Sequence, residues 1–480
     1  MDQPGHTSVW RSAARWAALL SIALATAAPL AARPSKARAP AAVVPAPSPL
    51  ETAARAQSDP DLLTFYAARK FQPLWLTADG GVTEAAGALI RFVETASYDG
   101  LDSATLDAAG LAAAVARLGA EATPAARAHA EVALARGFAA YVKAMRMAPA
   151  AEMAYESEAL RPLVQRTYWA LDEAARAPSL AQYVGEMRWM HPLYGELRRA
   201  LADGPPADPG VQRSALDTLQ RLRAIPPVPG AKYVLVDAAS ARLWMYQDGR
   251  VVDSMRVVVG KPDQQTPLLS GYIRHAILNP YWNIPHDLVP KNIAPNVLKL
   301  GLPYLKSRGY EVLSDWTPTA QVLDPKTVDW RKVADRELEL RVRQLPNGFN
   351  AMGRVKFEFP NPRGIYLHDT PEKGLLQKDK RQLSSGCIRL EDAARLGLWL
   401  FGTPLPDFAG QPEQKLDLPA LVPVYVTYLT AYAAAGAIAV GPDPYKRVGG
   451  PPPAALAQTA ASPAEPEAWS LPVPAGTASR

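Results

Sequence analysis

The sequence predicts an α+β multidomain protein, in which a mainly helical scaffold domain precedes a mainly β, sandwich-like domain with a lid insertion. Three observations lead to this fold class. Helical periodicity dominates residues 58–223, and short β-branched and aromatic runs separated by turns dominate residues 231–447. A Pro-rich hinge, residues 224–230, separates the two. With 480 residues, the chain is long enough for two or three domains.

The first residues have the composition of an export signal. Arg11 and Arg15 precede an apolar run over residues 16–32, and small residues with Ala-x-Ala spacing follow. A positive start, a short apolar run and small residues are typical of a secretory signal peptide. We expect residues 1–32 to be removed on export to the periplasm or to stay as an uncleaved inner-membrane anchor. No other segment of the sequence is apolar enough to cross a bilayer.

The helical domain is expected to follow a linker. Residues 33–57 are rich in Ala and Pro, which predicts a flexible or extended segment. Asp59 is a suitable N-cap, and Pro60 suits the first position of the helix that follows. Helical periodicity then continues to about Arg223, with Gly- and Pro-rich breaks. Chemically active residues are not concentrated there, so we expect a scaffold.

Beyond the hinge, apolar runs with strand character alternate with turns, which is typical of a sandwich or partly open barrel. Asp248 and Gly249 form the tip of a predicted hairpin. Residues 286–350 are longer and less regular, which predicts a lid or binding insertion. The tail, residues 448–480, is rich in Pro, Ala and Ser and is expected to be disordered.

Charge and ligand patterns exclude several functions. A net charge of +6 leaves room for an anionic partner such as the cell wall. Nucleic acid is not favoured, because the sequence lacks a dense basic run and a recognisable nucleic-acid motif. The sequence also has no Cys-x-x-Cys or His-x-x-x-His pair of the kind that binds metals. No metal and no cofactor is therefore expected.

Cys387 is the only cysteine in the chain. Exported proteins favour paired cysteines or none, so a lone thiol is a buried inert residue, an intermolecular link or a nucleophile. Gly386 precedes it and allows a sharp turn and close approach of a substrate. Residues 389–401 have a helical pattern, which would favour the thiolate at a helix N-terminus. Neighbouring backbone N–H groups would supply an oxyanion hole.

A thiol nucleophile needs a base, and His368 is the best candidate among the six histidines. It ends a predicted strand, a rigid place from which an imidazole can meet a cysteine on a loop. His275 lies in a strand-like run, where it is equally a core residue. His286 begins the predicted insertion, where a surface position is favoured over contact with substrate.

The segments around these residues resemble a known family. YLHDTPEK followed by SSGCIRLED resembles the catalytic signature of the L,D-transpeptidases, which cross-link bacterial cell walls. RVVVGKPDQQTPLLSGYIRHAILNPYWNIP, NAMGRVKFEFPN and PVPVYVTYLTAY resemble the large periplasmic branch of that family. FYAARKFQPLWL resembles the start of that branch's helical scaffold domain. The resemblance spans most of residues 60–447.

The sequence departs from the family pattern in two places. Ser385 stands where many members have His, so an essential side chain is not expected there. Large members often carry a three-helix peptidoglycan-binding module, and residues 201–229 are too short to hold one. Recognition of the wall is then expected from the scaffold or the insertion.

The resemblance implies a reaction on peptidoglycan stem peptides. Cys387 would attack the carbonyl of meso-diaminopimelate, the third residue of a donor tetrapeptide, releasing D-Ala and leaving a thioester. The side-chain amine of a second stem would resolve the thioester and join two third residues. His368 would transfer the protons. A backbone carbonyl would orient its imidazole, and Asp369 is expected to serve the turn.

Other readings of the same site stay open. Water as the acceptor would give an L,D-carboxypeptidase, and an amine of an envelope protein would give an anchoring enzyme. A non-catalytic wall-binding protein with an inert cysteine is a further alternative. The oligomeric state is left open.

Several residues are candidates for the oxyanion hole or substrate binding. Tyr366 shares a strand face with His368, so its hydroxyl would assist the oxyanion hole or simply pack. Arg389 would bind a substrate carboxylate or form a surface ion pair. Trp282 would line the cleft or lie in the core. The complete set comprises catalytic Cys387 and His368, with Gly386, Tyr366, Arg389, Ser385, Trp282 and Asn283 for the oxyanion or the substrate.

Overall fold

The computed structural model describes residues 46–120, 123–147, 153–317, 319–407 and 411–449. The described helices and strands all lie in the unit Pro47–Arg480. The predicted export signal, most of the predicted linker and most of the predicted tail lie outside the described residues. Across the described ranges, no helix combines the length and apolar character needed to cross a bilayer.

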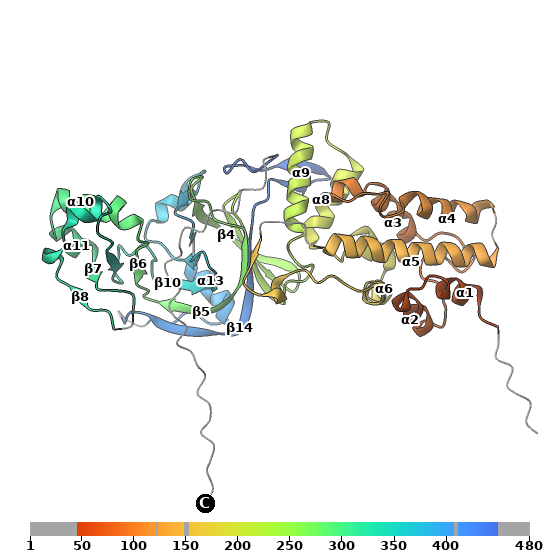
Figure 1. The fold of residues 1–480 in the computed structure, drawn as a ribbon, viewed down its shortest axis with the longest axis horizontal. Helices are drawn as coiled ribbons and strands as arrows, with labels where there is room; N and C mark the ends of the chain where they lie inside the picture. Colours follow the sequence, from red (N-terminus) through yellow and green to blue (C-terminus); the bar gives the residue numbers. More distant parts are fainter. Residues whose placement is uncertain (1–45, 121–122, 148–152, 318, 408–410, 450–480) are drawn as a thin grey trace, which may run out of the picture. The chain divides into compact units, whose positions relative to one another are not determined.

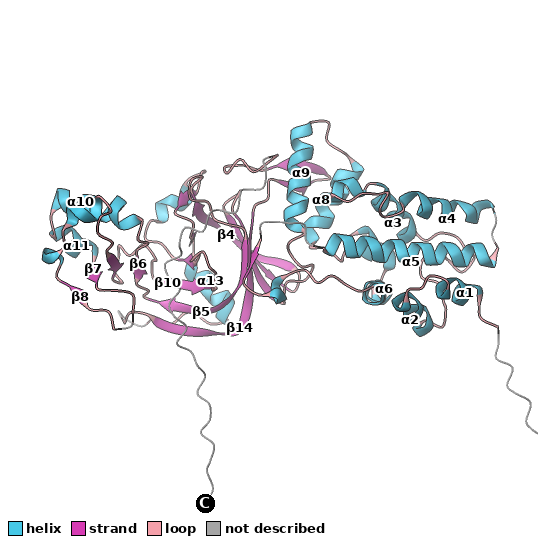
Figure 2. Ribbon diagram, viewed as in Figure 1, coloured by secondary structure: helices cyan, strands magenta, loops and turns pink. Residues whose placement is uncertain are grey.

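The first region is helical, as Figures 1 and 2 show. Asp59 caps α2 by accepting hydrogen bonds from the backbone N–H groups of Asp61 and Leu62, with Pro60 at the helix start, as predicted. Helix α1 lies in the segment predicted as linker. The elements are α1 (Pro49–Arg55), α2 (Pro60–Ala68), α3 (Glu84–Glu94), η1 (Ala96–Asp99), α4 (Ala108–Ala120), α5 (Pro124–Arg146), η2 (Glu158–Leu160), α6 (Thr167–Arg176), α7 (Leu180–Gly185), α8 (Pro192–Asp203) and α9 (Pro209–Leu222).

A buried charged cluster joins three of these elements. Arg198 on α8 donates through Nε to Asp99 of η1 at 2.8 Å, and both side chains are fully buried. The hydroxyls of Tyr141 and Tyr194 donate to the same carboxylate, each at 2.6 Å. A buried charge is tolerated only when it is paired and hydrogen-bonded. The cluster therefore fixes how η1, α5 and α8 pack.

The second region is β-rich, as predicted, and its main sheet closes on itself. Among the described residues, ten strands form one sheet, with β5-β10-β11-β13-β4-β3-β2-β14 in order. Because β14 also pairs with β5, both ends of this path meet. The strands are β1 (Ala154–Tyr155), β2 (Lys232–Asp237), β3 (Arg242–Gln247), β4 (Arg250–Gly260), β5 (Leu269–Leu278), β10 (Val355–Glu358), β11 (Leu367–His368), β12 (Gln382–Ser384), β13 (Ile388–Leu390) and β14 (Gln414–Thr427).

The turn between β3 and β4 is the hairpin that the sequence predicts. Gln247 pairs with Arg250 across it. At its tip Asp248 and Gly249 have φ values of 50° and 76°. Both central residues of a type I′ hairpin turn require positive φ, which Asp and Gly adopt readily.

The segment after the cysteine differs from the prediction. Instead of one helix over residues 389–401, Ile388–Leu390 form β13, and helix α13 (Ala393–Phe401) begins later. Asp392 is its N-cap and accepts a hydrogen bond from the Arg395 N–H. Pairing with β4 and β11 on either side determines the extended conformation here, and helical periodicity cannot report such pairing. Cys387 therefore precedes a strand.

The predicted insertion is a folded unit rather than an irregular loop. A four-stranded sheet in the order β6-β9-β7-β8 packs with short helices around its own apolar core, which includes Ile284, Val312 and Val342. Its elements are β6 (Trp282–Asn283), the π-helix η3 (Val289–Ile293), α10 (Ala294–Leu300), α11 (Pro303–Arg308), β7 (Tyr310–Leu313), β8 (Val322–Leu323), η4 (Pro325–Thr327), α12 (Trp330–Ala334) and β9 (Arg341–Gln344).

The helical and β-rich regions share a core. Tyr233, Tyr246 and Tyr425 of the main sheet belong to the same apolar cluster as the helices. His191, at the start of α8, is fully buried, and its Nε2 lies 2.9 Å from the Tyr233 hydroxyl. A hairpin of β15 (Ala431–Ala434) and β16 (Ala437–Val440) packs on α8 and α9. The scaffold therefore supports the sheet through direct contacts.

Candidate active site

The predicted nucleophile and base lie on one face of two adjacent strands. β11 and β13 are parallel, with Leu367 opposite Ile388 and His368 opposite Arg389. Side chains alternate along a strand, so Leu367 and Ile388 point into the buried core. Cys387 and His368 consequently project from the other face. The alternation thus places on one face the two residues that the sequence predicts to be catalytic.

The same face continues across two further strands. Lys356 on β10 pairs with His368, and Glu358 pairs with His275 on β5. The core-facing neighbours, Val355 and Phe357, are buried on the opposite side. We call this set the polar row: His275, Glu358, Lys356, Tyr366, His368, Cys387 and Arg389.

His368 has the geometry of a general base. Its side chain is only 3% exposed, and Nδ1 lies 2.6 Å from the backbone carbonyl oxygen of Asp369. A carbonyl only accepts, so Nδ1 carries the hydrogen, and Nε2 keeps the lone pair in the neutral ring. Burial, aided by the nearby charge of Arg389, lowers the pKa of His368 to about 4. The imidazole is therefore neutral at physiological pH and can accept a proton.

Cys387 is half-buried, and its Sγ–H donates to the Gly364 carbonyl at 3.6 Å. Burial raises the pKa of Cys387. A backbone hydrogen bond from Tyr366 and the cations Arg389 and Lys356 work in the opposite direction without overcoming it. Cys387 is followed by β13 and not by the predicted helix N-terminus that would favour a thiolate, and its raised pKa favours the thiol at rest.

The turn before Cys387 is tightly hydrogen-bonded. Gly386 has a φ of 119°, a backbone conformation that favours glycine, as the predicted sharp turn requires. Its N–H donates to Ser384 Oγ at 3.1 Å, and Ser384 Oγ donates to the Cys387 carbonyl at 2.6 Å. The Gly386 N–H is therefore engaged by Ser384 rather than aimed at an oxyanion. Ser385, the position that departs from the family pattern, is exposed.

Two other predicted residues belong to the polar row. Arg389 forms an ion pair with Glu372, so the ion-pair alternative describes its state in this structure. Tyr366 is half-buried, and its ring lies 4.8 Å from Lys356 Nζ. The Asp369 carboxylate accepts the Arg354 N–H at 2.9 Å and pairs with Lys373 at 2.7 Å.

Trp282 and Asn283 lie elsewhere. Both are on β6, which pairs with β9 in the sheet of the insertion and not with the main sheet. Trp282 packs against the insertion core, its predicted alternative, and Asn283 is exposed. His286 is exposed as well. His275 is half-buried, and its Nε2 lies 2.7 Å from Glu358.

Sequence reasoning missed Lys356, Glu358, Ser384 and Thr266. The segment RVKFEFP alternates apolar and charged residues with period two, which places Lys356 and Glu358 on the face opposite the core. This alternation is visible in the sequence, but the residues that lie beside Lys356 and Glu358 depend on which strand pairs with this one. Thr266 carries no such signal, because only the folded chain brings its hydroxyl to the Gly386 carbonyl.

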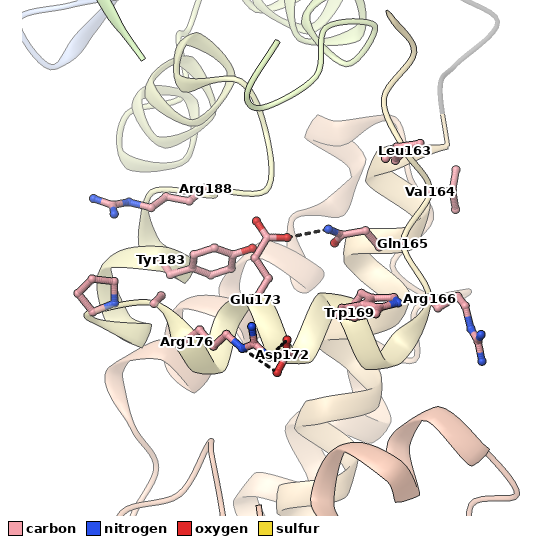
Figure 3. Close-up of a pocket in the computed structure, with 12 residues that line it drawn as sticks. Leu163, Val164, Gln165, Arg166, Trp169, Asp172, Glu173, Arg176, Tyr183 and Arg188 are labelled. Atoms are coloured by element: carbon pink, nitrogen blue, oxygen red, sulfur yellow. Dashed lines mark hydrogen bonds and ion pairs between the residues drawn. The ribbon is translucent and has the colours of Figure 1, made fainter. Parts of the chain in front are cut away.

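A separate cavity lies in the helical region. Figure 3 shows its lining, in which Gln165 donates a 2.6 Å hydrogen bond to Glu173 beside the exposed ring of Trp169. Its volume is about 840 Å³. Neither Cys387 nor His368 lines it. Within the described residues, no group of three or more His, Cys, Asp and Glu side chains could hold a metal ion.

Comparisons with known proteins find matches to both regions of the chain. The domain model described as "L,D-transpeptidase catalytic domain" matches residues 231–403, and the model described as "Scaffold domain" matches residues 60–201. A curated Haemophilus influenzae protein named "Putative L,D-transpeptidase" is 32% identical over 233 residues, 47% of this chain and 46% of that protein. The chain thus spans about half the length of the curated relative that it matches.

Solved structures with a lower likeness include L,D-transpeptidases of two organisms. The Enterococcus faecium enzyme is 15% identical, with 42% of this chain and 52% of that chain covered and a TM-score of 0.21. The Mycobacterium smegmatis enzyme is 15% identical, with 41% and 58% covered and a TM-score of 0.20. Residues 231–403 therefore match the L,D-transpeptidase catalytic domain model, and residues 60–201 ahead of them match the scaffold model.

Proposed function

We propose that this protein is an L,D-transpeptidase that cross-links peptidoglycan stem peptides through a thioester on Cys387. The observation that supports the proposal is the shared face of the paired strands β11 and β13, on which Cys387, just before β13, and the buried, neutral His368 both lie. The Asp369 carbonyl orients the imidazole, so no carboxylate is needed to complete a triad.

The first half-reaction releases D-Ala. His368 Nε2 takes the Sγ proton as the sulfur attacks the carbonyl of the third stem residue, diaminopimelate. The tetrahedral intermediate collapses when the C–N bond to D-Ala breaks, and His368 returns the proton to the leaving amine. A thioester and free D-Ala result, and His368 is neutral again.

The second half-reaction forms the cross-link. The side-chain amine of an acceptor stem attacks the thioester, and His368 takes a proton from that amine. The C–S bond breaks, the proton returns to the sulfur, and an amide between two third residues remains. Because Gly386 is engaged by Ser384 at rest, the oxyanion would be met by Tyr366 or by backbone N–H groups that realign on substrate binding.

The remaining site residues receive roles in substrate binding. Arg389 would exchange Glu372 for a substrate carboxylate, since a guanidinium pairs with either carboxylate. Asn283 and Ser385, which are both exposed, would contact the stem peptides. We place the reaction in the periplasm, on the basis of the signal-like residues 1–32.

The test is mass spectrometry of purified disaccharide-tetrapeptide incubated with the full chain. The expected product is a cross-linked dimer that is absent with Cys387→Ala. Tripeptide without dimer would replace the proposal with an L,D-carboxypeptidase. Transfer only to an added envelope protein would indicate an anchoring enzyme. No thioester and no labelling of Cys387 by a carbapenem would favour a non-catalytic wall-binding protein.

A further inference from the structure

A buried lysine lies beside the candidate catalytic pair, and the reaction above does not use it. Lys356 pairs directly with His368 across β10 and β11. Its Nζ lies 4.8 Å from the centroid of the Tyr366 ring, and its side chain is only 13% exposed. Lysine is seldom buried unless it is paired. A buried ammonium at this position in the polar row indicates a specific role.

Glu358, which is itself bound by His275, keeps the Lys356 ammonium charged. Glu358 forms an ion pair with it, and His275 Nε2 binds the other carboxylate oxygen at 2.7 Å. Burial opposes ionisation of Glu358, but His275 and Lys356 together lower the pKa of Glu358 to about 2. Burial likewise opposes the ammonium, but Glu358 outweighs it and raises the pKa of Lys356. The ammonium is thus a fixed positive charge near neutral pH.

This charge reaches both members of the catalytic pair. Lys356 and Arg389 are the cations that oppose the rise in the pKa of Cys387 on burial. Lys356 also adds to the lowering of the pKa of His368, after burial and Arg389. Of the two cations, Arg389 is held by the exposed carboxylate of Glu372. Lys356 is instead held by Glu358, a partly buried residue of the same strand, β10.

We propose that Lys356 is a positioning residue for the nucleophile, whose ammonium, fixed by Glu358, stabilises the negative charge that forms on the Cys387 sulfur. No bond to Lys356 forms or breaks, and it keeps its proton throughout. The proton leaves Sγ for His368 Nε2, and the electron pair stays on the sulfur. The same charge makes the imidazolium a stronger acid, which favours return of the proton to the leaving amine.

Other charged and titratable groups face this part of the sheet and enter the balance. They are His275 of β5, Glu358 of β10, Tyr366 and His368 of β11, Arg389 of β13, Glu372 ahead of η5 (Lys373–Gln377), and Glu413, Lys415 and Asp417 around the start of β14. Lys415 carries the same charge as Lys356 but lies beyond β5 and pairs with Asp417 at 2.9 Å. It therefore provides a matched control.

The test measures the rate of Cys387 alkylation by iodoacetamide against pH, in full-length protein without substrate. Lys356→Met is expected to raise the midpoint by about one pH unit, the lower end of the effect of a neighbouring opposite charge. Lys356→Arg should restore it, and Lys415→Met should leave it unchanged. A purely structural lysine would lower the melting temperature without moving the midpoint. Because no stem peptide is involved, the result is independent of the proposed function.

A second comparison covers the case in which Lys356→Met fails to fold. Glu358→Gln and the double variant Lys356→Met/Glu358→Gln both lack the buried carboxylate, so neither leaves it unpaired. The pH midpoint of Cys387 alkylation is again expected to be higher in the double variant, which lacks the lysine, than in Glu358→Gln. Equal midpoints within either pair of folded proteins would overturn the proposal, whatever the change in melting temperature.

Discussion

The hydroxyl of Thr266 donates a 2.7 Å hydrogen bond to the carbonyl of Gly386. The hydroxyl oxygen of Thr266 also accepts a hydrogen bond from the Gly260 N–H at 2.8 Å, and the Thr266 side chain is fully buried. One side chain thus ties the turn before Cys387 to the end of β4. Thr266→Val keeps the shape but leaves two buried backbone groups without this partner, at about 1–3 kcal/mol each. We expect a lower melting temperature by calorimetry and slower alkylation of Cys387.

Thr266→Ser is the matched control, because it keeps the hydroxyl and loses only a methyl group. Its alkylation rate should stay close to that of the unmodified protein. A valine variant that matches the serine variant in both stability and alkylation would contradict the role assigned to this hydrogen bond.

Gly386→Ala should impair the nucleophile more than the fold. The φ of 119° is strained for any residue with a side chain, and an added Cβ would lie 3.2 Å from Ile365 Cδ1. Strain of this type costs about 1–3 kcal/mol, and rotation of the turn would displace the thiol. The acylation rate with a carbapenem should fall at least tenfold. Gly374→Ala, where the added Cβ meets no atom within 4 Å, should acylate normally.

The pH dependence of acylation should report the buried state of His368. Because the pKa of His368 is lowered to about 4, the base is neutral and active above that pH and is lost as the pH falls through 4. Acylation rates measured from pH 3.5 to 8 should therefore show their acidic limb near 4. A limb near 6.5, the ordinary pKa of histidine, would mean that the imidazole is solvated in the working enzyme.

Stability should fall in mild acid because of His191. Burial lowers the pKa of His191 to about 4 in the folded chain, and the unfolded value is about 6.5. Between these values only the unfolded state binds the proton, so the free energy of unfolding decreases as the pH falls from 6.5 to 4. The loss reaches about 3 kcal/mol for this residue. It is measurable as the difference in melting temperature between pH 7.5 and pH 5.

His191→Gln provides the comparison for this effect. Its amide can still bond to the Tyr233 hydroxyl but does not titrate. The melting temperature of this variant should depend less on pH over the same range, with His368 supplying part of the remaining dependence. Identical pH dependence in both proteins would rule out His191 as a source.

Breaking the buried ion pair of the scaffold should be severe. Arg198→Met leaves the Asp99 carboxylate buried with only the two tyrosine hydroxyls, which costs about 3–5 kcal/mol. Arg176→Met removes an arginine from an exposed pair with Asp172 and should cost under about 0.5 kcal/mol. Urea unfolding of the two variants gives the comparison. Equal losses would contradict the stabilising role assigned to the buried pair.

The sequence was sufficient for those features that rest on local chemistry. Asp59 and Pro60 mark the start of α2, and Asp248 and Gly249 mark a hairpin, because each preference acts within a few residues. Cys387 and His368 were predicted from residue types and motif. The structure adds the register that places them on one face.

The features that the sequence missed depend on long-range pairing. Ile388–Leu390 are extended only because β4 and β11 lie on either side, so the local helical pattern of residues 389–401 misled. The sequence predicts an irregular insertion because the strands of its sheet are far apart along the chain; Trp282, for example, pairs with Gln344. The sequence does not single out Lys356, because only the pairing of β10 with β11 shows that it lies opposite His368.

The pairing of β13 protects the active site from small errors in folding. A shift of one residue along this strand would bury Cys387 and Arg389 among Leu367 and Phe357, and would expose Ile388 and Leu390 to water. Any such slip costs the hydrophobic core before it affects catalysis. Substitutions that leave positions 388 and 390 apolar therefore also preserve the orientation of the Cys387 thiol. Selection that maintains the apolar residues on the buried face of β13 therefore also maintains the position of the polar residues on its other face.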